Sequence, residues 1–414
     1  MVAAPPQSVP LQWDLPPGRT FLNHGSFGLA PRELLQWRFE LLQQIEHDPV
    51  HFLTEQLPPQ LAEARQGLAG LLGAQPQQVA FVPSTTYGLN ELLQRLPLLE
   101  PDLAEGSEIL LASHAYNATV NLVRFAAEQR GWRMRLVELP WPQQGATQVV
   151  EAFAQAWSTN TRVLVLDHIT SPSALELPLE PLIALARSRG ARVIVDGAHA
   201  PGLVPLRLDA LQPDAYVGNL HKWLCCPRGS AFLWVGQRWV QRLRPLVVSH
   251  GANAPVQPGV CRFHLEHDWL GTADPTPWLA LPQVLRLFQW PTPPQWPQRM
   301  ADNAARAQRG RGWLLEALLE ANCAPLDVSP QGTQQLAMAA VPLPCPQELD
   351  GVRLQQLLYE RGFQVPVIPL RPHCPELPQF LRISCFDYTS DADLQRLAAV
   401  LPGVLALLRA ESQA

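Results

Sequence analysis

The stretches RVIVDGAHAPG (192–202) and AYVGNLHKWL (215–224) decide the fold. Each begins with an apolar run that can form a buried strand, and each run ends in polar residues. Further apolar runs of strand length lie at 79–83, 108–112, 133–139, 162–167 and 231–235. Segments with helical periodicity separate most of them, at 87–96, 118–130, 149–158 and 179–189. Strands that are apolar on both faces and alternate with helices predict an α/β fold with a mostly parallel, seven-stranded sheet covered by helices on both sides.

A second α/β unit is expected near the C-terminus, because a chain of 414 residues is long enough for two domains. The proline-rich stretch FQWPTPPQWP (288–297) is unsuited to a helix or a central strand and is expected to be a connector. After it the pattern predicts helices at 303–320, 352–361 and beyond Ser390, and strands at 335–341 and 380–384. We therefore expect an N-terminal arm (1–20), a large domain (21–284) and a small C-terminal domain (285–414).

The composition argues against several classes of protein. Apolar residues make up 47% of the chain, and the net charge of -5 gives no positive surface for nucleic acid or an anionic membrane. Residues 1–19 lack the pattern of a signal peptide, and the apolar stretch 397–408 is shorter than the ~20 residues of a membrane span. Seven cysteines without CxxC spacing favour reduced thiols in the cytoplasm. The run HLEH (264–267) has no further ligands nearby, so we expect no metal site.

Lys222 is the only lysine among 31 basic residues (Lys plus Arg). Its amine can become a nucleophile when its pKa is lowered, whereas a guanidinium stays protonated. Asp196 ends the preceding strand, and the carboxyl ends of neighbouring parallel strands meet at one edge of a sheet. Ser84-Thr85-Thr86 follow another strand and open a helix, where they can bind phosphate or simply cap the helix. An amine, a carboxylate and phosphate donors together are what pyridoxal phosphate requires.

Six segments carry a resemblance to a known family: FLNHGSFG (21–28), PSTTYGLN (83–90), SHAYNA (113–118), VDGAHAPG (195–202), GNLHKWLCCPRGSAFLWV (218–235) and GTADPTPWLALP (271–282). Through them the chain resembles the class V aminotransferases, which are fold-type I pyridoxal-phosphate enzymes. Within that family it is most similar to the isopenicillin N epimerase-like branch. The spacing from the aspartate to HKW is the most specific part, and the resemblance spans about 20–408. It implies the fold-type I architecture and pyridoxal 5'-phosphate as the cofactor.

The resemblance implies roles for individual residues at the cofactor. Lys222 would form the Schiff base and carry the Cα proton, while Asp196 would pair with the ring nitrogen. His199 would hydrogen-bond the ring 3-oxygen, and Tyr116 would stack on the ring. The phosphate ligands that it implies are Thr85, Thr86, Asn219, His221 and, from the partner subunit of a homodimer, Thr272.

The substrate side of the resemblance is less specific. Arg382, in the run LRIS, would bind the carboxylate of a small amino-acid substrate, as a bidentate guanidinium can. Asn23 and His24 would line the substrate pocket.

Three reactions and one non-enzymatic role remain open. Epimerisation needs a second proton donor beside Lys222, and Tyr116 and His24 are the candidates. Elimination, as in a cysteine or cystine C–S lyase, needs only one base and a leaving group at Cβ. Desulfuration by a cysteine desulfurase needs a nucleophilic cysteine, for which Cys374 is the one candidate, although its sequence context does not favour it. A degenerate protein that binds pyridoxal phosphate without turnover is the non-enzymatic alternative, which the retention of Lys222, Asp196 and Arg382 argues against.

Overall fold

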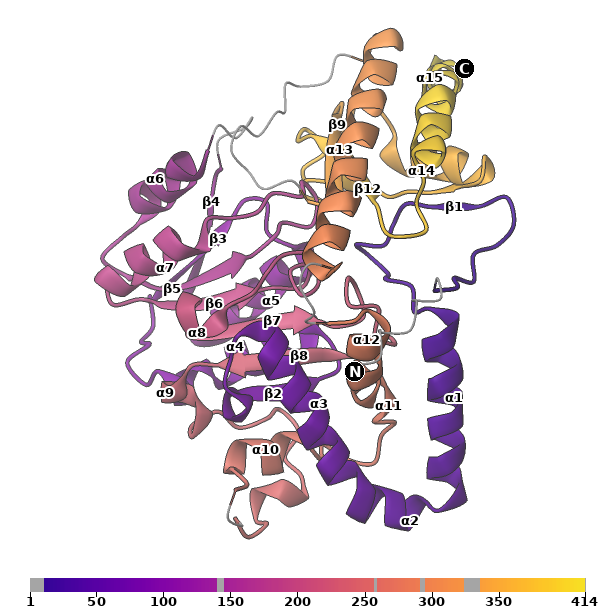
Figure 1. Ribbon diagram of the computed structural model, residues 1–414. Helices are drawn as coiled ribbons and strands as arrows, with labels where there is room; N and C mark the ends of the chain where they lie inside the picture. Colours follow the sequence, from indigo (N-terminus) through magenta and orange to yellow (C-terminus); the bar gives the residue numbers. More distant parts are fainter. Residues whose placement is uncertain (1–10, 140–144, 257–258, 291–294, 324–335, 414) are drawn as a thin grey trace.

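The computed structural model describes residues 11–139, 145–256, 259–290, 295–323 and 336–413 (Figure 1). A seven-stranded sheet forms its centre, in the order β2-β8-β7-β6-β5-β3-β4. The strands are β2 (Val79–Val82), β3 (Glu108–Ala112), β4 (Arg133–Val137), β5 (Thr161–Asp167), β6 (Arg192–Asp196), β7 (Ala215–Asn219) and β8 (Ala231–Val235). β8 runs antiparallel to both of its neighbours, and the other pairings described in this sheet are parallel. The predicted fold class, a mostly parallel α/β sheet, is confirmed.

Successive residues of each central strand enter two different hydrophobic cores, which is why the strands are apolar throughout. Leu164 and Leu166 of β5 lie in one core, whereas Val163 and Val165 lie in the other. The crossover helices pack over both faces of the sheet in Figure 1. The helices between the parallel strands are α4 (Thr85–Leu99), α5 (Asn117–Arg130), α6 (Ala146–Ala156), α7 (Leu179–Ser188) and the short α8 (Leu208–Leu211). Flanking the sheet are α1 (Arg32–His47), α2 (Pro49–His51), α3 (Leu57–Leu72), α9 (Gln237–Val240), α10 (Arg262–His267), α11 (Thr276–Leu279) and α12 (Leu281–Leu287).

A smaller C-terminal unit has its own sheet and its own core. Its three antiparallel strands, in the order β11-β12-β9, are β9 (Met338–Leu343), β11 (Val367–Pro369) and β12 (Gln379–Ser384). Its helices are α13 (Gln295–Glu320), α14 (Gly351–Glu360) and α15 (Asp391–Gln413), drawn in orange to yellow in Figure 1. A third hydrophobic cluster, with Leu314, Leu354, Ile383 and Leu397, joins these helices to the sheet.

Two element boundaries in the C-terminal unit differ from the expectations. Residues 295–297, expected in a connector, begin α13, since a proline such as Pro297 is tolerated in the first turn of a helix. The strand expected at 335–341 begins at Met338, and residue 335 lies outside the described residues. The strand β1 (Thr20–Phe21) pairs in parallel with β10 (Phe363–Gln364), so the chain enters through the C-terminal unit. The boundary at 284/285 stays a prediction.

Two further expectations concern membranes and metals. None of the helices in the described ranges is both long enough and apolar enough to cross a bilayer. In the HLEH run, His264 Nε2 lies 3.1 Å from the carbonyl of Pro76, while His267 Nε2 lies 2.8 Å from Glu91 Oε1. The two imidazoles therefore have separate protein partners, and the described residues contain no cluster of three metal-binding side chains.

Candidate active site

A cavity of about 380 Å³ lies where the carboxyl ends of β2, β5, β6 and β7 meet. Parallel strands place their carboxyl ends at one edge, which explains why residues far apart in sequence gather there. Nine of the predicted site residues line this cavity: Thr85, Thr86, Tyr116, Asp196, His199, Asn219, His221, Lys222 and Arg382.

Lys222 lies in the turn after β7 and presents its amine to the cavity. Its Nζ atom is 3.2 Å from Nε2 of His199. Burial of the amine, reinforced by the charge of Arg382, lowers the pKa of Lys222 to about 7. Gly28 fixes the position of this turn, because a Cβ at residue 28 would overlap the carbonyl oxygen of Lys222. An amine with such a pKa is partly unprotonated near neutral pH and can attack a carbonyl group.

Asp196 is a buried carboxylate whose two oxygens both have donors. Thr119 Oγ1 donates to Oδ2 at 2.8 Å, and the amide of Ala198 donates to Oδ1 at 3.1 Å. Burial raises the pKa of Asp196, while these two hydrogen bonds and the charge of Lys222 oppose the rise. Gly197 packs directly against the ring of Tyr216, because a Cβ at residue 197 would overlap that ring.

The N-terminus of α4 forms the opposite end of the cavity. Asn219 Oδ1 accepts a hydrogen bond from the amide of Thr85 at 3.0 Å, and the hydroxyl of Thr85 is buried without a partner among the described residues. His221 Nδ1 donates to the carbonyl of Ser230 at 2.9 Å, which leaves Nε2 as its other ring nitrogen. Burial lowers the pKa of His221 to about 4. Hydroxyls and amides at the start of a 15-residue helix are groups that can bind an anion.

Arg382 is a buried guanidinium, 1% exposed, at the edge of the cavity on β12. Its Nη1 donates to the carbonyl of Ser171 at 2.6 Å and to the hydroxyl of the same residue at 3.0 Å, and Nη2 donates to Ser26 Oγ at 2.5 Å. No carboxylate among the described residues forms an ion pair with it. Burial lowers the pKa of Arg382 to about 10. A buried cation of this kind is suited to a ligand that brings its own carboxylate.

Tyr116 lies at the N-terminus of α5, with its side chain 45% exposed at the cavity. Its amide donates a hydrogen bond of 3.1 Å to Oδ1 of Asp167. The hydrogen bond to Asp167 fixes the backbone of Tyr116, and its ring can lie over a ligand in the cavity.

Three predicted residues do not line this cavity. His24 stacks on Phe386, with ring centroids 4.0 Å apart, and its Nδ1 is 2.7 Å from the hydroxyl of Tyr388. Burial lowers the pKa of His24 to about 3, so it is neutral and lies in an aromatic cluster instead of the pocket. Asn23 forms an isolated bridge with Ser384 beside β12. Thr272 is exposed in the loop before α11, outside the cavity of its own chain.

The lining residues that sequence reasoning missed include Ser26, Phe27, Asp167 and Arg228. Ser26 and Phe27 lie in an irregular segment, where no periodicity predicts orientation. Asp167 carried a usable signal, because it ends an apolar strand just as Asp196 does. Cys374, the candidate for a desulfurase, does not line the cavity, and neither does any other cysteine of the described residues.

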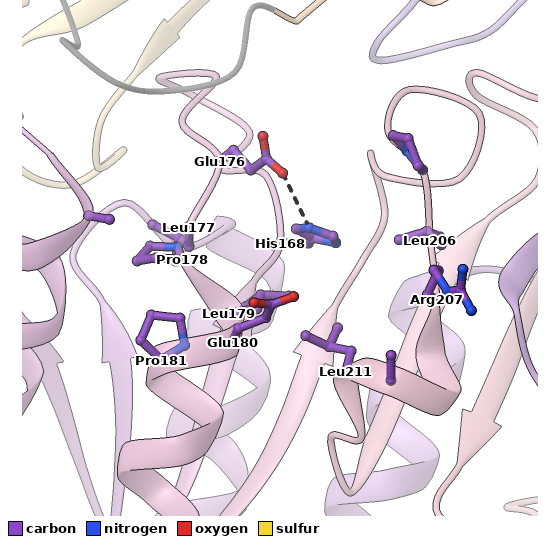
Figure 2. A pocket seen from close by; sticks show the side chains of 13 residues that line it. His168, Glu176, Leu177, Pro178, Leu179, Glu180, Pro181, Leu206, Arg207 and Leu211 are labelled. Atoms are coloured by element: carbon purple, nitrogen blue, oxygen red, sulfur yellow. Dashed lines mark ion pairs between the residues drawn. The ribbon is translucent and has the colours of Figure 1, made fainter. Parts of the chain in front are cut away.

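A second cavity, of about 570 Å³, opens beside α7 and α8 (Figure 2). Figure 2 shows Glu176 directed toward His168, and the ion pair between them measures 3.7 Å. His168 follows Asp167, and its Nδ1 lies 2.8 Å from the hydroxyl of Tyr216. None of the predicted site residues lines this second cavity, so we place the candidate active site in the smaller one.

The comparison with family models matches aminotransferase class-V over residues 33–290, more than half of the chain. The chain belongs to the aminotransferase class-V family. It is 34% identical to an isopenicillin N epimerase of Amycolatopsis lactamdurans, over 94% of this chain and 96% of that protein. It is 30% identical to a putative L-cysteine desulfhydrase 1 of Oryza sativa subsp. japonica, over 64% of this chain and 56% of that protein.

A solved structure supports the class V fold. The structure of a cystine C–S lyase in complex with its reaction product cysteine persulfide matches with a TM-score of 0.76. The match covers 93% of this chain and 97% of that chain at 22% identity. The class V resemblance and the fold-type I architecture predicted from the sequence are confirmed.

Proposed function

We propose that this class V protein is a pyridoxal-phosphate enzyme that acts at the Cα of an amino-acid substrate. The observation that carries the proposal is one cavity holding the only lysine of the chain, the buried Asp196, and a buried arginine that has no carboxylate partner in the described part of the chain. These groups match an aldehyde, a ring nitrogen and a substrate carboxylate, respectively.

The residues of the cavity fit the cofactor in further detail. The hydroxyl of Thr85 and Nδ1 of His199 are buried polar atoms without a partner among the described residues. Thr85 lies at the N-terminus of α4, where a phosphate would be bound with Thr86, Asn219 and His221. We assign Nε2 of His199 as the acceptor of the bond with Lys222, so that its hydrogen is on Nδ1 and can be donated to the ring 3-oxygen.

Three residues of the cavity have separate roles in the reaction at Cα. Pyridoxal phosphate, when bound, withdraws electrons from the Cα of the attached amino acid. Arg382 orients the substrate through its carboxylate, and Lys222 takes the Cα proton because its lowered pKa leaves a free amine near pH 7. Asp196 accepts hydrogen bonds from Thr119 and Ala198, and it would keep the ring nitrogen of the bound cofactor protonated.

Epimerisation is the first candidate reaction. It is supported by the isopenicillin N epimerase of A. lactamdurans, which is similar along nearly the whole chain. The reaction returns the proton to the face of Cα opposite to Lys222, so it requires a second donor. Tyr116 lines the cavity and fits this role, whereas His24 is neutral and lies outside the cavity.

Elimination at Cβ, as in an L-cysteine desulfhydrase, is the second candidate. It is favoured by the similarity to the rice relative and by a cavity in which Lys222 is a sufficient base. Desulfuration has less support, because the cavity has no cysteine among its described residues.

We also propose a homodimer and a cytoplasmic location. Thr272 lies on an exposed loop, from which it could reach the phosphate site of a partner subunit only. Size measurements by light scattering, with and without a Thr272→Tyr substitution that would crowd the interface, test the dimer. A monomeric wild type would exclude the contribution of Thr272.

A deuterium-exchange experiment tests the function. The purified protein with pyridoxal phosphate is incubated in heavy water with L-amino acids, including cysteine, cystine and an aminoadipyl peptide. Deuterium at Cα with loss of chirality supports an epimerase, whereas deuterium with pyruvate and a sulfur product supports a lyase. Lys222→Ala is the control. If this variant retains both turnover and the visible absorbance of the bound cofactor, the catalytic assignment is wrong; cofactor absorbance without exchange of any substrate favours a degenerate binder.

A further inference from the structure

The cavity contains a second buried carboxyl group, Asp167, beside Asp196. The two residues are register partners at the carboxyl ends of β5 and β6, and each is 3% exposed. Register partners of neighbouring parallel strands point to the same side of a sheet and are about 5 Å apart. Both line the cavity, so the two carboxyl groups lie at the same depth at its floor.

The hydrogen bonds of the two carboxyl groups differ. Asp196 receives a donor on each oxygen, from Thr119 and Ala198. Asp167 receives one, from the amide of Tyr116 on Oδ1, while its Oδ2 is buried without a partner among the described residues. A carboxylate stabilised by two donors stays ionised more easily than one with a single donor. The carboxyl that keeps a proton in this pair is therefore Asp167.

The charges around the pair lead to the same assignment. Asp167 faces Asp196 from β6, Lys222 from the turn after β7, Tyr116 from α5, and Arg382 across the cavity on β12. Burial, and then the negative charge of Asp196, raise the pKa of Asp167 well above its ordinary value. Two buried neighbouring carboxylates cannot both ionise without a large cost, and Lys222, even when it is protonated, offsets only one of the two charges.

We propose that Asp167 is a neutral carboxylic acid whose Oδ2 hydroxyl donates a hydrogen bond to the ligand bound beside Asp196. The identity of that ligand, pyridoxal phosphate, rests on the proposed function. The paired roles give the floor of the cavity one charged acceptor, Asp196, and one neutral donor, Asp167. Asp167 is thus a further binding residue, and it also holds the backbone of Tyr116 through Oδ1.

Infrared difference spectroscopy of the cofactor-free protein tests the protonation state without any ligand. The spectrum of wild type minus Asp167→Asn at neutral pH should contain the C=O stretch of a protonated carboxylic acid. The matched control is Asp274→Asn, since Asp274 is paired with Arg38 and should contribute only carboxylate bands. A difference spectrum of Asp167→Asn with carboxylate bands alone would overturn the proposal.

Cofactor affinity tests the hydrogen bond. An asparagine at 167 can accept from Tyr116 through its oxygen and donate into the cavity through its nitrogen, so Asp167→Asn should bind pyridoxal phosphate within about threefold of wild type. Asp167→Val replaces the carboxyl group with an apolar side chain that cannot donate, and it should bind about tenfold more weakly. Asp196→Asn, the same chemical change one strand away, should weaken binding more than Asp167→Asn does.

The outcomes separate this inference from the proposed function. If wild type forms no Lys222-dependent absorbance with pyridoxal phosphate, the proposed function fails, and the infrared result still decides the protonation of Asp167. If Asp167→Asn weakens binding as much as Asp196→Asn, Asp167 acts as an anion and the inference is wrong. An unchanged affinity of Asp167→Val would exclude contact between Oδ2 and the ligand. Should the valine variant fail to fold, Asp167→Ala, which also has no donor, replaces it in the same comparison.

Discussion

The amine of Lys222 and the imidazole of His199 share one hydrogen bond, with Nζ and Nε2 3.2 Å apart. Burial lowers the pKa of His199 well below its ordinary value, so the imidazole is neutral, and we assign its Nε2 as the acceptor of this bond. Its hydrogen is then on Nδ1, which has no partner among the described residues. One contact therefore presents two functional groups to the cavity, a nucleophilic amine and a neutral donor.

The pKa of Lys222 predicts the pH dependence of its reaction with an aldehyde. Only the unprotonated amine is nucleophilic, so the rate of reaction with pyridoxal phosphate should rise with pH, with a midpoint near the pKa of about 7. Stopped-flow absorbance from pH 5.5 to 9 measures this midpoint. Arg382→Met removes a cation that lowers the pKa of Lys222 and should move the midpoint upward. A midpoint near the ordinary lysine value in wild type would contradict the assignment.

Thr119 is predicted to act through Asp196. Thr119→Val removes the hydroxyl that donates to Oδ2 at 2.8 Å, which frees the carboxylate to move and raises its pKa. Loss of one such bond corresponds to about 1–2 kcal/mol, so cofactor affinity should fall about tenfold. Titration by tryptophan fluorescence measures the affinity. Thr119→Ser retains the hydroxyl and should restore most of it; equal losses in both variants would point to packing instead.

Arg382 is predicted to recognise the substrate and not the cofactor. Arg382→Met removes the buried guanidinium without filling the cavity with a new charge, so the KM of the substrate should rise by about 30-fold or more. The affinity for pyridoxal phosphate should change far less, because Thr85, Asp196 and Lys222 hold the other end. Steady-state kinetics and a cofactor titration provide the two measurements. Arg382→Lys keeps the charge but loses the two-pronged geometry, and it should be intermediate; a loss of cofactor affinity equal to the change in KM would contradict the role.

One geometrical rule explains why the sequence could predict that Asp196 and Lys222 lie close together. Side chains that end neighbouring parallel strands lie at one edge of the sheet, and both residues line the same cavity. The same rule applies to Asp167, which ends the strand β5. The neighbour relation between β5 and β6 makes it part of the site.

The sequence was least informative where the chain is irregular. His24 lies in a segment without periodicity, and its orientation is determined by Phe386 and Tyr388, which lie more than 360 residues away. No local pattern contains such contacts. The predicted start of α13 was wrong for a different reason. Proline is excluded from the interior of a helix but is tolerated in its first turn, so the proline-rich stretch did not rule out a helix that begins there.

The stability of the cofactor-free protein should depend on pH through Asp167. In the folded protein the pKa of Asp167 is raised well above its unfolded value of about 3.8. The protonated carboxyl therefore contributes its full stabilisation below pH 3.8, and this contribution to the free energy of unfolding is lost as the pH rises through the folded pKa. Across this window the loss is about 1.4 kcal/mol per pH unit for one proton. Asp167→Asn carries no titratable proton there, so its free energy of unfolding should improve relative to wild type as pH rises from 4.5 to 7.5.

Urea unfolding at several pH values measures this difference, and Asp274 provides a control of opposite sign. The pKa of Asp274 is lowered overall: burial, the largest effect, raises it, but hydrogen bonds from Thr276 and Arg38 outweigh that rise. Its contribution is therefore present above the unfolded pKa and lost as pH falls through the folded one. Asp274→Asn should lose stability relative to wild type as pH rises from 2.5 to 5. The Asp274→Asn difference reports one carboxyl group, whereas the Asp167→Asn difference reports the proton that Asp167 and Asp196 share as a coupled pair. If the Asp167→Asn difference does not change with pH, Asp167 is ionised in the folded protein and its role as a neutral donor is excluded.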